Sequence, residues 1–290
     1  MKKIISFIIV ILMFCSCSQI KQSDDDKFEI VCTVFPAYDW IREIAKNTDT
    51  EITLIPSNGT DIHSYQPTAE DIIKISECDL FVYASSGEKV WYDDILKPDT
   101  EKINIVKVSE DYHENDEHIW MSLDEASEIS EILAKKISLL NKKDAKSYLR
   151  NAEIYIEKLE ELDDKYENTV DNANKRIIIV ADRFPFHYLT DEYNVKYFAA
   201  FEGCTSESEV SFETITKLAN KAEEYNIKCL LTAENCDNKI ARAVINNLSD
   251  KNVKILVLNS MQSVSFKELD NISYISVMEE NLNVLKEALD

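Results

Sequence analysis

The chain has 290 residues, with 54 Asp and Glu against 32 Lys and Arg, and its formal net charge is −22. Such a charge repels nucleic acid and anionic membrane surfaces, so neither polyanion is expected as a partner. Only three glycines occur, and neither a GxGxxG sequence nor a P-loop is present, which argues against a nucleotide-dependent enzyme.

The first residues are typical of an export signal. Lys2 and Lys3 precede an apolar run over 4–14, which is about a dozen residues and so too short to span a bilayer. We therefore expect a signal peptide over 1–17. The polar residues 18–27 would then form a solvated tether.

Two cysteines follow the apolar run, in Cys15-Ser16-Cys17. A small residue before a cysteine at this place resembles a bacterial lipobox, in which the cysteine becomes the lipid-modified first residue. Ser16 favours Cys17 as the attachment site, because Cys15 would follow the bulky Phe14. Secretion without lipid is the alternative.

Short apolar runs alternate with segments of helical periodicity along the remaining chain. This alternation is typical of βα units on a mainly parallel sheet. Strands are expected at 28–35, 51–56, 79–85, 103–109, 175–182, 195–203, 227–234 and 253–260. Helices are expected from 37, 68, 88 and 123 in the first half and over 185–193, 211–225, 238–248 and 272–289 in the second.

Between the two halves, residues 144–173 carry apolar side chains at helical spacing without Gly or Pro. A helix of this length is a rod of about 40 Å, which restricts hinge closure more than a flexible crossover would. We predict two α/β lobes, over 28–142 and 175–290, joined by one long rigid helix over 143–174, with a ligand cleft between them.

Five cysteines remain beyond the lipobox, without a CxxC pair. Cys32, Cys78 and Cys229 lie in or beside apolar runs, where cysteine is usually a small buried hydrophobe. We predict no zinc knuckle, no thioredoxin motif and no disulfide.

The chain has four histidines, and three of them follow expected strands at or before a helix. His63 precedes a helix that begins at a capping box, Thr68 to Asp71. His118 lies in an acidic loop before the helix at 123, and His113 stands five residues earlier. Because ligands bind outside the carboxyl ends of parallel strands, these histidines are candidates to converge on one cleft. His113 could equally be only an exposed residue of that loop.

Several motifs resemble the zinc/manganese solute-binding family of ABC importers, called cluster A-I, in matching order along nearly all of the mature chain. They are GTDIHSYQPTAED, EHIWMSLDEASEI, FPFHYLTDEY and SYISVMEENLNVLKEAL, besides the long central helix. The resemblance implies that His63 and His118 are metal ligands, although Ile62 replaces the proline that usually precedes the first ligand.

The family's third ligand stands three residues before the Phe of an F-x-Y motif. With Phe186-His187-Tyr188 as that motif, the position holds Arg183, a permanent cation that cannot coordinate a metal. His187 or Asp182 could take its place, and we favour His187 because zinc prefers its nitrogen. His187 could also be simply an exposed helical residue.

The family's fourth ligand, an Asp, corresponds to Asn259, whose amide oxygen is a weaker donor. That coordination position could be empty, filled by water or supplied by Glu234. Glu209 matches a family acidic position with a structural role. A histidine-rich donor set favours zinc over manganese, which would want more carboxylate.

The resemblance implies a non-enzymatic role, and we expect a monomer. The chain would be lipid-anchored on the outer face of the cell membrane, where it would capture a divalent transition metal and deliver it to an ABC permease and its ATPase. One alternative is a zinc-dependent hydrolase, although HExxH is absent and no histidine has a neighbouring glutamate suited to act as general base. The other is the same fold binding a metal chelate or an organic solute, with Arg183 facing an anionic group.

Overall fold

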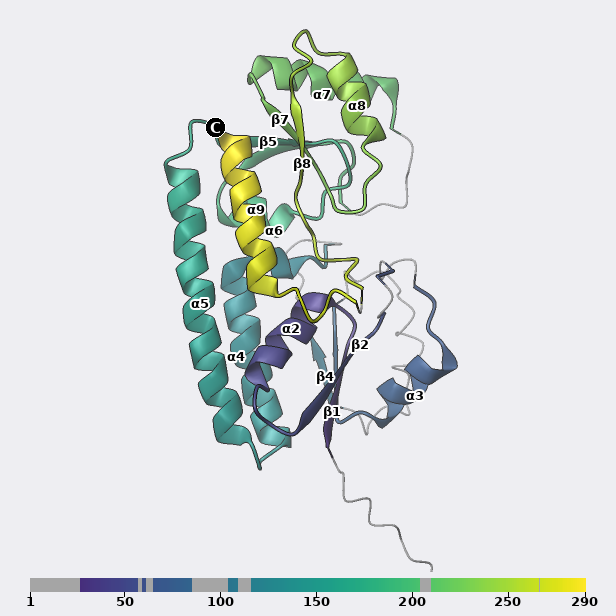
Figure 1. Ribbon diagram of the computed structural model, residues 1–290, viewed down its shortest axis with the longest axis vertical. Helices are drawn as coiled ribbons and strands as arrows, with labels where there is room; N and C mark the ends of the chain where they lie inside the picture. The colour runs from purple at the N-terminus through teal and green to yellow at the C-terminus, as the bar shows by residue number, and fades with distance from the viewer. Residues whose placement is uncertain are drawn as a thin grey trace, which may run out of the picture.

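The computed structural model describes residues 27–56, 59–60, 65–84, 104–108, 116–203, 210–265 and 267–290. Two four-stranded sheets lie at opposite ends of a group of long helices (Figure 1). The strands are β1 (Phe28–Cys32), β2 (Thr50–Leu54), β3 (Leu80–Tyr83) and β4 (Asn104–Lys107), then β5 (Ile177–Val180), β6 (Lys196–Ala199), β7 (Cys229–Thr232) and β8 (Lys254–Val257). The helices are α2 (Phe35–Ile44), α3 (Ala69–Glu77), the 3₁₀ turn η3 (Ile119–Met121), α4 (Leu123–Leu140), α5 (Ala145–Asp171), α6 (His187–Glu192), α7 (Phe212–Glu224), α8 (Lys239–Asn246) and α9 (Tyr274–Leu289).

The two sheets have equivalent topologies. Their strand orders are β2-β1-β3-β4 and β6-β5-β7-β8, and every described pair of neighbours is parallel. In each sheet the second strand lies on one side of the first strand and the third and fourth lie on the other. The loops after β1 and β3, and after β5 and β7, therefore diverge at the carboxyl edge, where ligands bind in such folds. The expected α/β class with two parallel-sheet lobes is confirmed.

Several expected strands are longer than those observed, such as the strand expected over 195–203, which is β6, and the predicted boundary between the first strand and the first helix was wrong. The expected strand over 28–35 ends at Cys32, and α2 begins at Phe35 rather than at 37. Pro36 stands in the first turn of this helix, where its fixed φ favours the helix and its missing N–H has no intrahelical partner to lose. The predicted capping box is confirmed, since Thr68 and Asp71 hydrogen-bond reciprocally at the start of α3. The helix expected from 88 lies outside the described residues.

Helix α5 has 27 residues and so a length of about 40 Å, as the periodicity predicted. It packs against α4, α2 and α9. Its buried face carries a regular row of tyrosine, leucine and small residues. The Tyr166 hydroxyl, for example, donates a 2.6 Å hydrogen bond to the carbonyl of Met278 in α9. The helix therefore fixes the lobes through packing along its whole length.

Helix α9 is a second connection between the lobes, which the sequence did not predict. Its first N–H, from Tyr274, donates to the buried Asp39 carboxylate on α2 at 2.7 Å. Asp39 also pairs with Arg42, which donates to the carbonyls of Leu269 and Ile272 just before α9. At the other end, the carbonyl of Leu289 accepts from Lys175 N at 3.1 Å. Figure 1 shows α9 running beside α5 from the first lobe to the second.

The buried apolar side chains form two clusters. The larger extends from the first sheet through α4, α5 and α9 to the inner face of the second sheet. The smaller lies between the outer face of the second sheet and helices α7 and α8. Burial of this extent is the main favourable contribution to folding.

The predicted burial of three cysteines is confirmed, because Cys32, Cys78 and Cys229 are free thiols inside the two lobes. Burial raises the pKa of Cys78 to about 12 and the pKa of Cys32 further still. Such thiols are unreactive in the folded protein.

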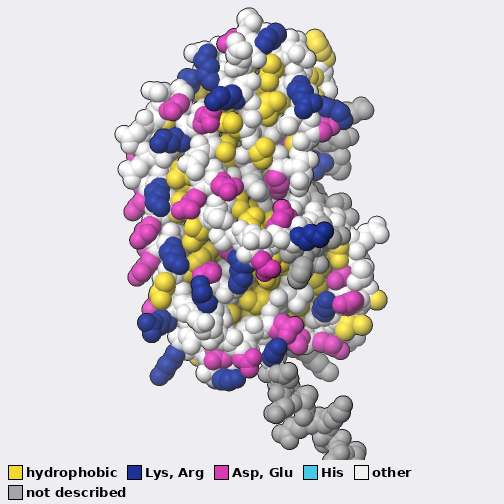
Figure 2. Space-filling model, viewed as in Figure 1, with side chains coloured by type: hydrophobic (Ala, Val, Ile, Leu, Met, Phe, Trp, Pro, Cys, Tyr) yellow, Lys and Arg dark blue, Asp and Glu magenta, His cyan; other side chains and the backbone are white. Residues whose placement is uncertain are grey.

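The surface seen in Figure 2 carries acidic and basic side chains interspersed. Exposed ion pairs form between them, for instance Lys254 with Glu287 at 2.6 Å, and pairs of this kind contribute little to stability. Within the described ranges, no helix combines the length and the apolarity that crossing a bilayer requires.

Candidate metal centre

His118 lies immediately before η3 and is only 2% exposed. Its Nδ1 atom and the Asp116 carboxylate form a short hydrogen bond, and the backbone N–H of His118 donates to the same oxygen, Oδ1, at 2.9 Å. The edge of the Trp120 ring system packs nearby, with ring centroids 5.1 Å apart. The imidazole is therefore held in one orientation by a carboxylate on one side and an indole on the other.

His187 is the first residue of α6 in the second lobe, and its side chain is 21% exposed. Its Nδ1 atom lies 2.7 Å from the other oxygen of the same carboxylate, Asp116 Oδ2. The rings of Phe184 and Tyr197 contact it edge-on, at centroid distances of 4.8 and 5.6 Å. Two histidines 69 positions apart in sequence thus meet on one side chain, at the level between the two sheets where α6 lies in Figure 1.

Asp116 is the residue at this site that sequence reasoning missed. Burial alone would raise the pKa of its carboxyl, but the charge of His118 and the hydrogen bonds from His118 and His187 hold that pKa well below its usual range. The carboxylate is therefore ionised at neutral pH. The only sequence signal for it was an acidic residue two positions before a candidate histidine.

Asp182 and Glu234, the two carboxylates proposed from the sequence, lie at the carboxyl edge of the second sheet. Asp182 accepts from the backbone N–H of Arg183 at 2.9 Å and from that of Ala233 at 3.1 Å. Glu234 accepts from Ser260 N at 2.8 Å and from Gln262 N at 3.1 Å. Both carboxylates therefore join the loops that follow β5, β7 and β8 to one another.

Asn259, at the position of the family's fourth ligand, is also engaged. Its Oδ1 atom accepts from Met261 N at 2.8 Å, and its N–H donates to Asn281 Oδ1 at 2.8 Å. Arg183 is partly buried beside Asp182. His63, His113, Glu209 and the cysteines of the lipobox lie outside the described residues.

Trp120 joins the two lobes directly beside His118. Its indole Nε1–H donates to the carbonyl of Ser260, after β8, at 2.8 Å. Its own carbonyl accepts from the Tyr274 hydroxyl at the start of α9 at 2.7 Å. The His118 segment is thus attached to two parts of the second half of the chain.

A second acidic group lies further along the same junction. Asp124, Asp163 and Glu192 bring carboxylate oxygens within 4.8 Å of one another. Glu192 accepts from the first two N–H groups of α4, those of Leu123 and Asp124, each at 3.2 Å. Burial raises its pKa to about 7. Glu192 therefore caps the N-terminus of α4 by accepting its first N–H groups.

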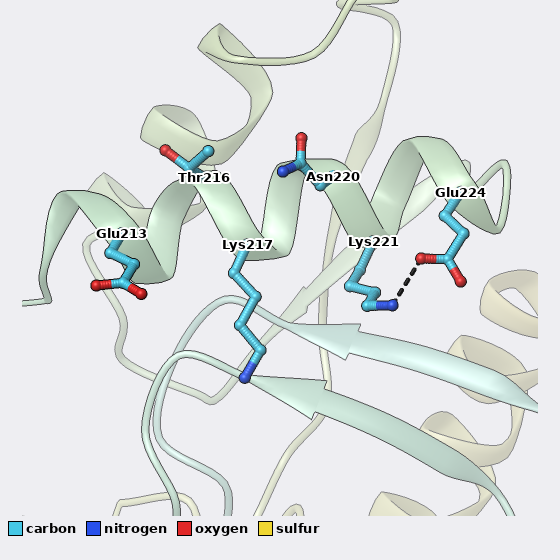
Figure 3. A pocket seen from close by; sticks show the side chains of 6 residues that line it. All are labelled: Glu213, Thr216, Lys217, Asn220, Lys221 and Glu224. Carbon is cyan, nitrogen blue, oxygen red and sulfur yellow. Dashed lines mark hydrogen bonds and ion pairs between the residues drawn. The ribbon is translucent and has the colours of Figure 1, made fainter.

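The surface hollow in Figure 3 has different chemistry. It lies along one face of α7 and is lined by two lysines, two glutamates, a threonine and an asparagine, with Lys221 and Glu224 paired at 2.6 Å. It contains no histidine or cysteine, and its charges neutralise one another. We assign it no part in metal binding.

Comparison with known proteins places the chain in one family. Residues 30–288 match the model of the family described as zinc-uptake complex component A, periplasmic. The high-affinity zinc uptake system protein ZnuA of Bacillus subtilis is 28% identical over 312 residues, which cover 99% of this chain and 96% of that protein. The zinc-binding lipoprotein AdcA of Streptococcus pneumoniae R6 is 29% identical over 303 residues, which cover 96% of this chain but only 59% of AdcA.

The solved structures agree. The crystal structure of the Zn(II)-bound ZnuA-like domain of S. pneumoniae AdcA superposes with a TM-score of 0.76 and 28% identity, covering 91% of this chain and 99% of that domain. The chain therefore spans about three fifths of the longer AdcA relatives and nearly all of their ZnuA-like part. It belongs to the zinc-uptake complex component A family.

Proposed function

We propose that this chain is the extracytoplasmic substrate-binding component of an ABC importer and that zinc is its cargo. Membership of the family supports this role. The names of the ZnuA and AdcA relatives support zinc as the metal. The partners would be an ABC permease and its ATPase, and the chain would act as a monomer that releases its cargo to them without chemical conversion.

The observation that carries the proposal is the convergence of His118 and His187, from different lobes, on Asp116. Hydrogen bonds at Nδ1 make Nε2 the coordinating nitrogen of each ring. With His63 as the third nitrogen ligand, the site would provide three imidazoles and one further position. Zinc favours such a set, whereas manganese favours more oxygen.

We assign Asp182 and Glu234 to holding the loops of the second lobe rather than to the metal. Each carboxylate accepts two backbone N–H groups, from Arg183 and Ala233 or from Ser260 and Gln262, which holds it in position on these loops. A movement toward a metal that broke these hydrogen bonds would cost about 1–3 kcal/mol for each buried group left unpaired. The fourth coordination position would then be open to water.

The chain would reach its place of action through the export signal over 1–17 and a lipid on Cys17, with 18–27 as the tether. Mass spectrometry of the membrane fraction tests this part directly. A diacylglyceryl group on Cys17 is expected, and an unmodified N-terminus in the culture medium would contradict it.

Calorimetric titration of the full chain in detergent with zinc, manganese and iron(II) tests the metal. One zinc per chain is expected, with affinity lowered at least about 100-fold in His118→Ala and in His187→Ala, because each loses one of few metal bonds. Glu128→Gln, exposed on α4, is the matched control for loss of a charge. Zinc affinity unchanged in both histidine variants would refute the site.

The hydrolase alternative gains no support from the described residues. Asp116, the carboxylate that touches both imidazoles, is committed to their Nδ1 atoms and so is poorly placed as a general base. Zinc-dependent turnover of ester, amide or phosphate substrates that His118→Ala abolishes would nevertheless replace the transport proposal.

A further inference from the structure

We propose that Asp116 is a positioning residue that fixes the tautomer of His118 and of His187 together, so that both rings present Nε2 to the cargo. This inference rests on the proposed function, because it explains how a site shared between two lobes is kept ready for a metal. It assigns Asp116 no bond to the metal itself.

The two oxygens of the Asp116 carboxylate are divided between the two rings. Oδ1 faces the Nδ1 atom of His118, and Oδ2 faces the Nδ1 atom of His187 at 2.7 Å. Oδ1 also accepts the backbone N–H of His118, and a carboxylate that accepts at both oxygens requires the hydrogen of each ring on Nδ1. In a neutral imidazole the lone pair is then on Nε2, which is the nitrogen that can bind a metal.

The Asp116 carboxylate cannot easily rotate away from the two imidazoles. It is 8% exposed, and Oδ1 also accepts the backbone N–H of His118 at 2.9 Å. Rotating the carboxylate to serve only one ring would break hydrogen bonds to the other ring or to the backbone. Both imidazoles therefore depend on the same carboxylate for the acceptor that faces Nδ1.

The aromatic contacts of the two rings restrict their orientation without selecting a tautomer. Trp120 contacts His118 edge-on, and Phe184 and Tyr197 contact His187 in the same way. Ring edges restrict orientation but offer no acceptor to Nδ1. Of the described contacts, those with Asp116 are the ones that distinguish the two nitrogens of each ring.

The substitution Asp116→Asn separates this role from simple packing. An amide of nearly the same shape has one acceptor and one donor group, so it can accept from only one of the two Nδ1 atoms. The ring that faces the amide N–H must accept there and carry its own hydrogen on Nε2, which then cannot coordinate. Asp116→Glu keeps two acceptor oxygens and is the conservative variant.

Nitrogen-15 NMR of histidine-labelled full chain, without metal and at pH 8.5, reads the tautomers directly. Only four histidines contribute signals, and His118→Ala and His187→Ala assign two of them by loss. We expect both to carry hydrogen on Nδ1 in the wild type, and one to carry it on Nε2 in Asp116→Asn. Wild-type rings with hydrogen on Nε2 would overturn the inference without any variant.

Zinc titration of the same samples supplies the second measurement. Asp116→Asn should bind zinc about 10–100-fold more weakly than the wild type, as expected when a carboxylate that orients a ligand is removed. Asp116→Glu should recover part of the loss, whereas Glu128→Gln should bind as the wild type does. Wild-type affinity in Asp116→Asn would overturn the inference alone, whereas wild-type affinity in His118→Ala would overturn the proposed function.

Discussion

The two lobes have the same strand order, but the side chains on the loops at their carboxyl edges make different contacts. In the first lobe, the segment after β4 provides His118 and the carboxylate that orients it. In the second, Asp182 and Glu234 occupy the loops after β5 and β7, and both are used to bind neighbouring backbone. Equivalent topology therefore predicts where polar side chains gather, but the hydrogen bonds that they make there differ between the lobes.

The lobes also differ in how they are supported. The first sheet shares one apolar core with α4, α5 and α9, whereas the second sheet has an additional separate core against α7 and α8. Besides the apolar core that reaches both sheets, the junction between the lobes contains directional contacts, made by Asp39, Trp120 and Glu192 among others. Changing these contacts one at a time tests how far each lobe depends on the other.

The largest effect is expected from Asp39→Ala, which removes one buried attachment of the first lobe to α9. The variant leaves Arg42 and the Tyr274 N–H without their buried acceptor, so the free energy of unfolding should fall by about 3–5 kcal/mol. Urea denaturation followed by circular dichroism measures it. Asp39→Asn, which keeps an acceptor for Tyr274, should lose less, and a loss below 1 kcal/mol in Asp39→Ala would show that α9 does not depend on this contact.

Glu192→Gln should change how the free energy of unfolding depends on pH. Burial raises the pKa of Glu192 from 4.5 to about 7. The folded state therefore favours the protonated carboxyl, and the stability that this form contributes is fully present below pH 4.5 and is lost as the pH rises through 7. The variant lacks this loss. Its advantage over the wild type in unfolding free energy should therefore grow by about 1–3 kcal/mol between pH 5 and pH 8.

The measurement is urea denaturation of both proteins at several pH values across that range. Asp124 and Asp163 face the same carboxylate, so both stay unchanged in the comparison. Glu128→Gln, which alters an exposed charge on α4, should reproduce the wild-type profile. A constant difference between Glu192→Gln and the wild type would contradict the assignment.

Glu234→Gln tests whether the second lobe supplies support rather than a ligand. The amide cannot accept from Ser260 and Gln262 together as the carboxylate does, so stability should fall by about 1–3 kcal/mol. Zinc affinity measured by calorimetry should change by less than about threefold, under 1 kcal/mol. A loss comparable with that of His118→Ala would instead make Glu234 a ligand.

The smallest effect is expected from Trp120→Phe, which removes the 2.8 Å hydrogen bond from the first lobe to Ser260. Trp40→Phe is the matched control, because Trp40 is equally buried and its Nε1 has no hydrogen-bond partner among the described residues. Trp120→Phe should cost about 1 kcal/mol more than Trp40→Phe in urea denaturation. Equal losses would mean that packing alone joins the lobes at this point.

Local patterns predicted much of this architecture. Alternating apolar and amphipathic segments indicated the strands and helices of both sheets, and the box at Thr68 and Asp71 located the start of α3. The boundary near Phe35 was wrong because β1 continues into α2 through an apolar run, and only Pro36 distinguishes them. These features depend on residues that are close together in the sequence, so they can be predicted from it.

The contacts that assemble the site depend on distant residues and were not predictable in the same way. Asp116 meets His187 across 71 positions, and Asp39 meets Tyr274 across 235. Nothing local to Asp182 or Glu234 indicated that their oxygens would be taken by Ala233, Ser260 and Gln262. Family resemblance identified the histidines, but the partners of the acidic residues followed only from the fold.

The buried cysteines make each lobe its own reporter of opening. Cys32 lies inside the first sheet and Cys229 inside the second, and neither thiol can react while its sheet is closed. Of the four cysteines that the structure describes, the partly exposed Cys236 would be alkylated first. The alkylation rates of Cys32 and Cys229, resolved by peptide mass mapping, would then record how often each half of the molecule opens, and no cysteine has to be introduced into either half.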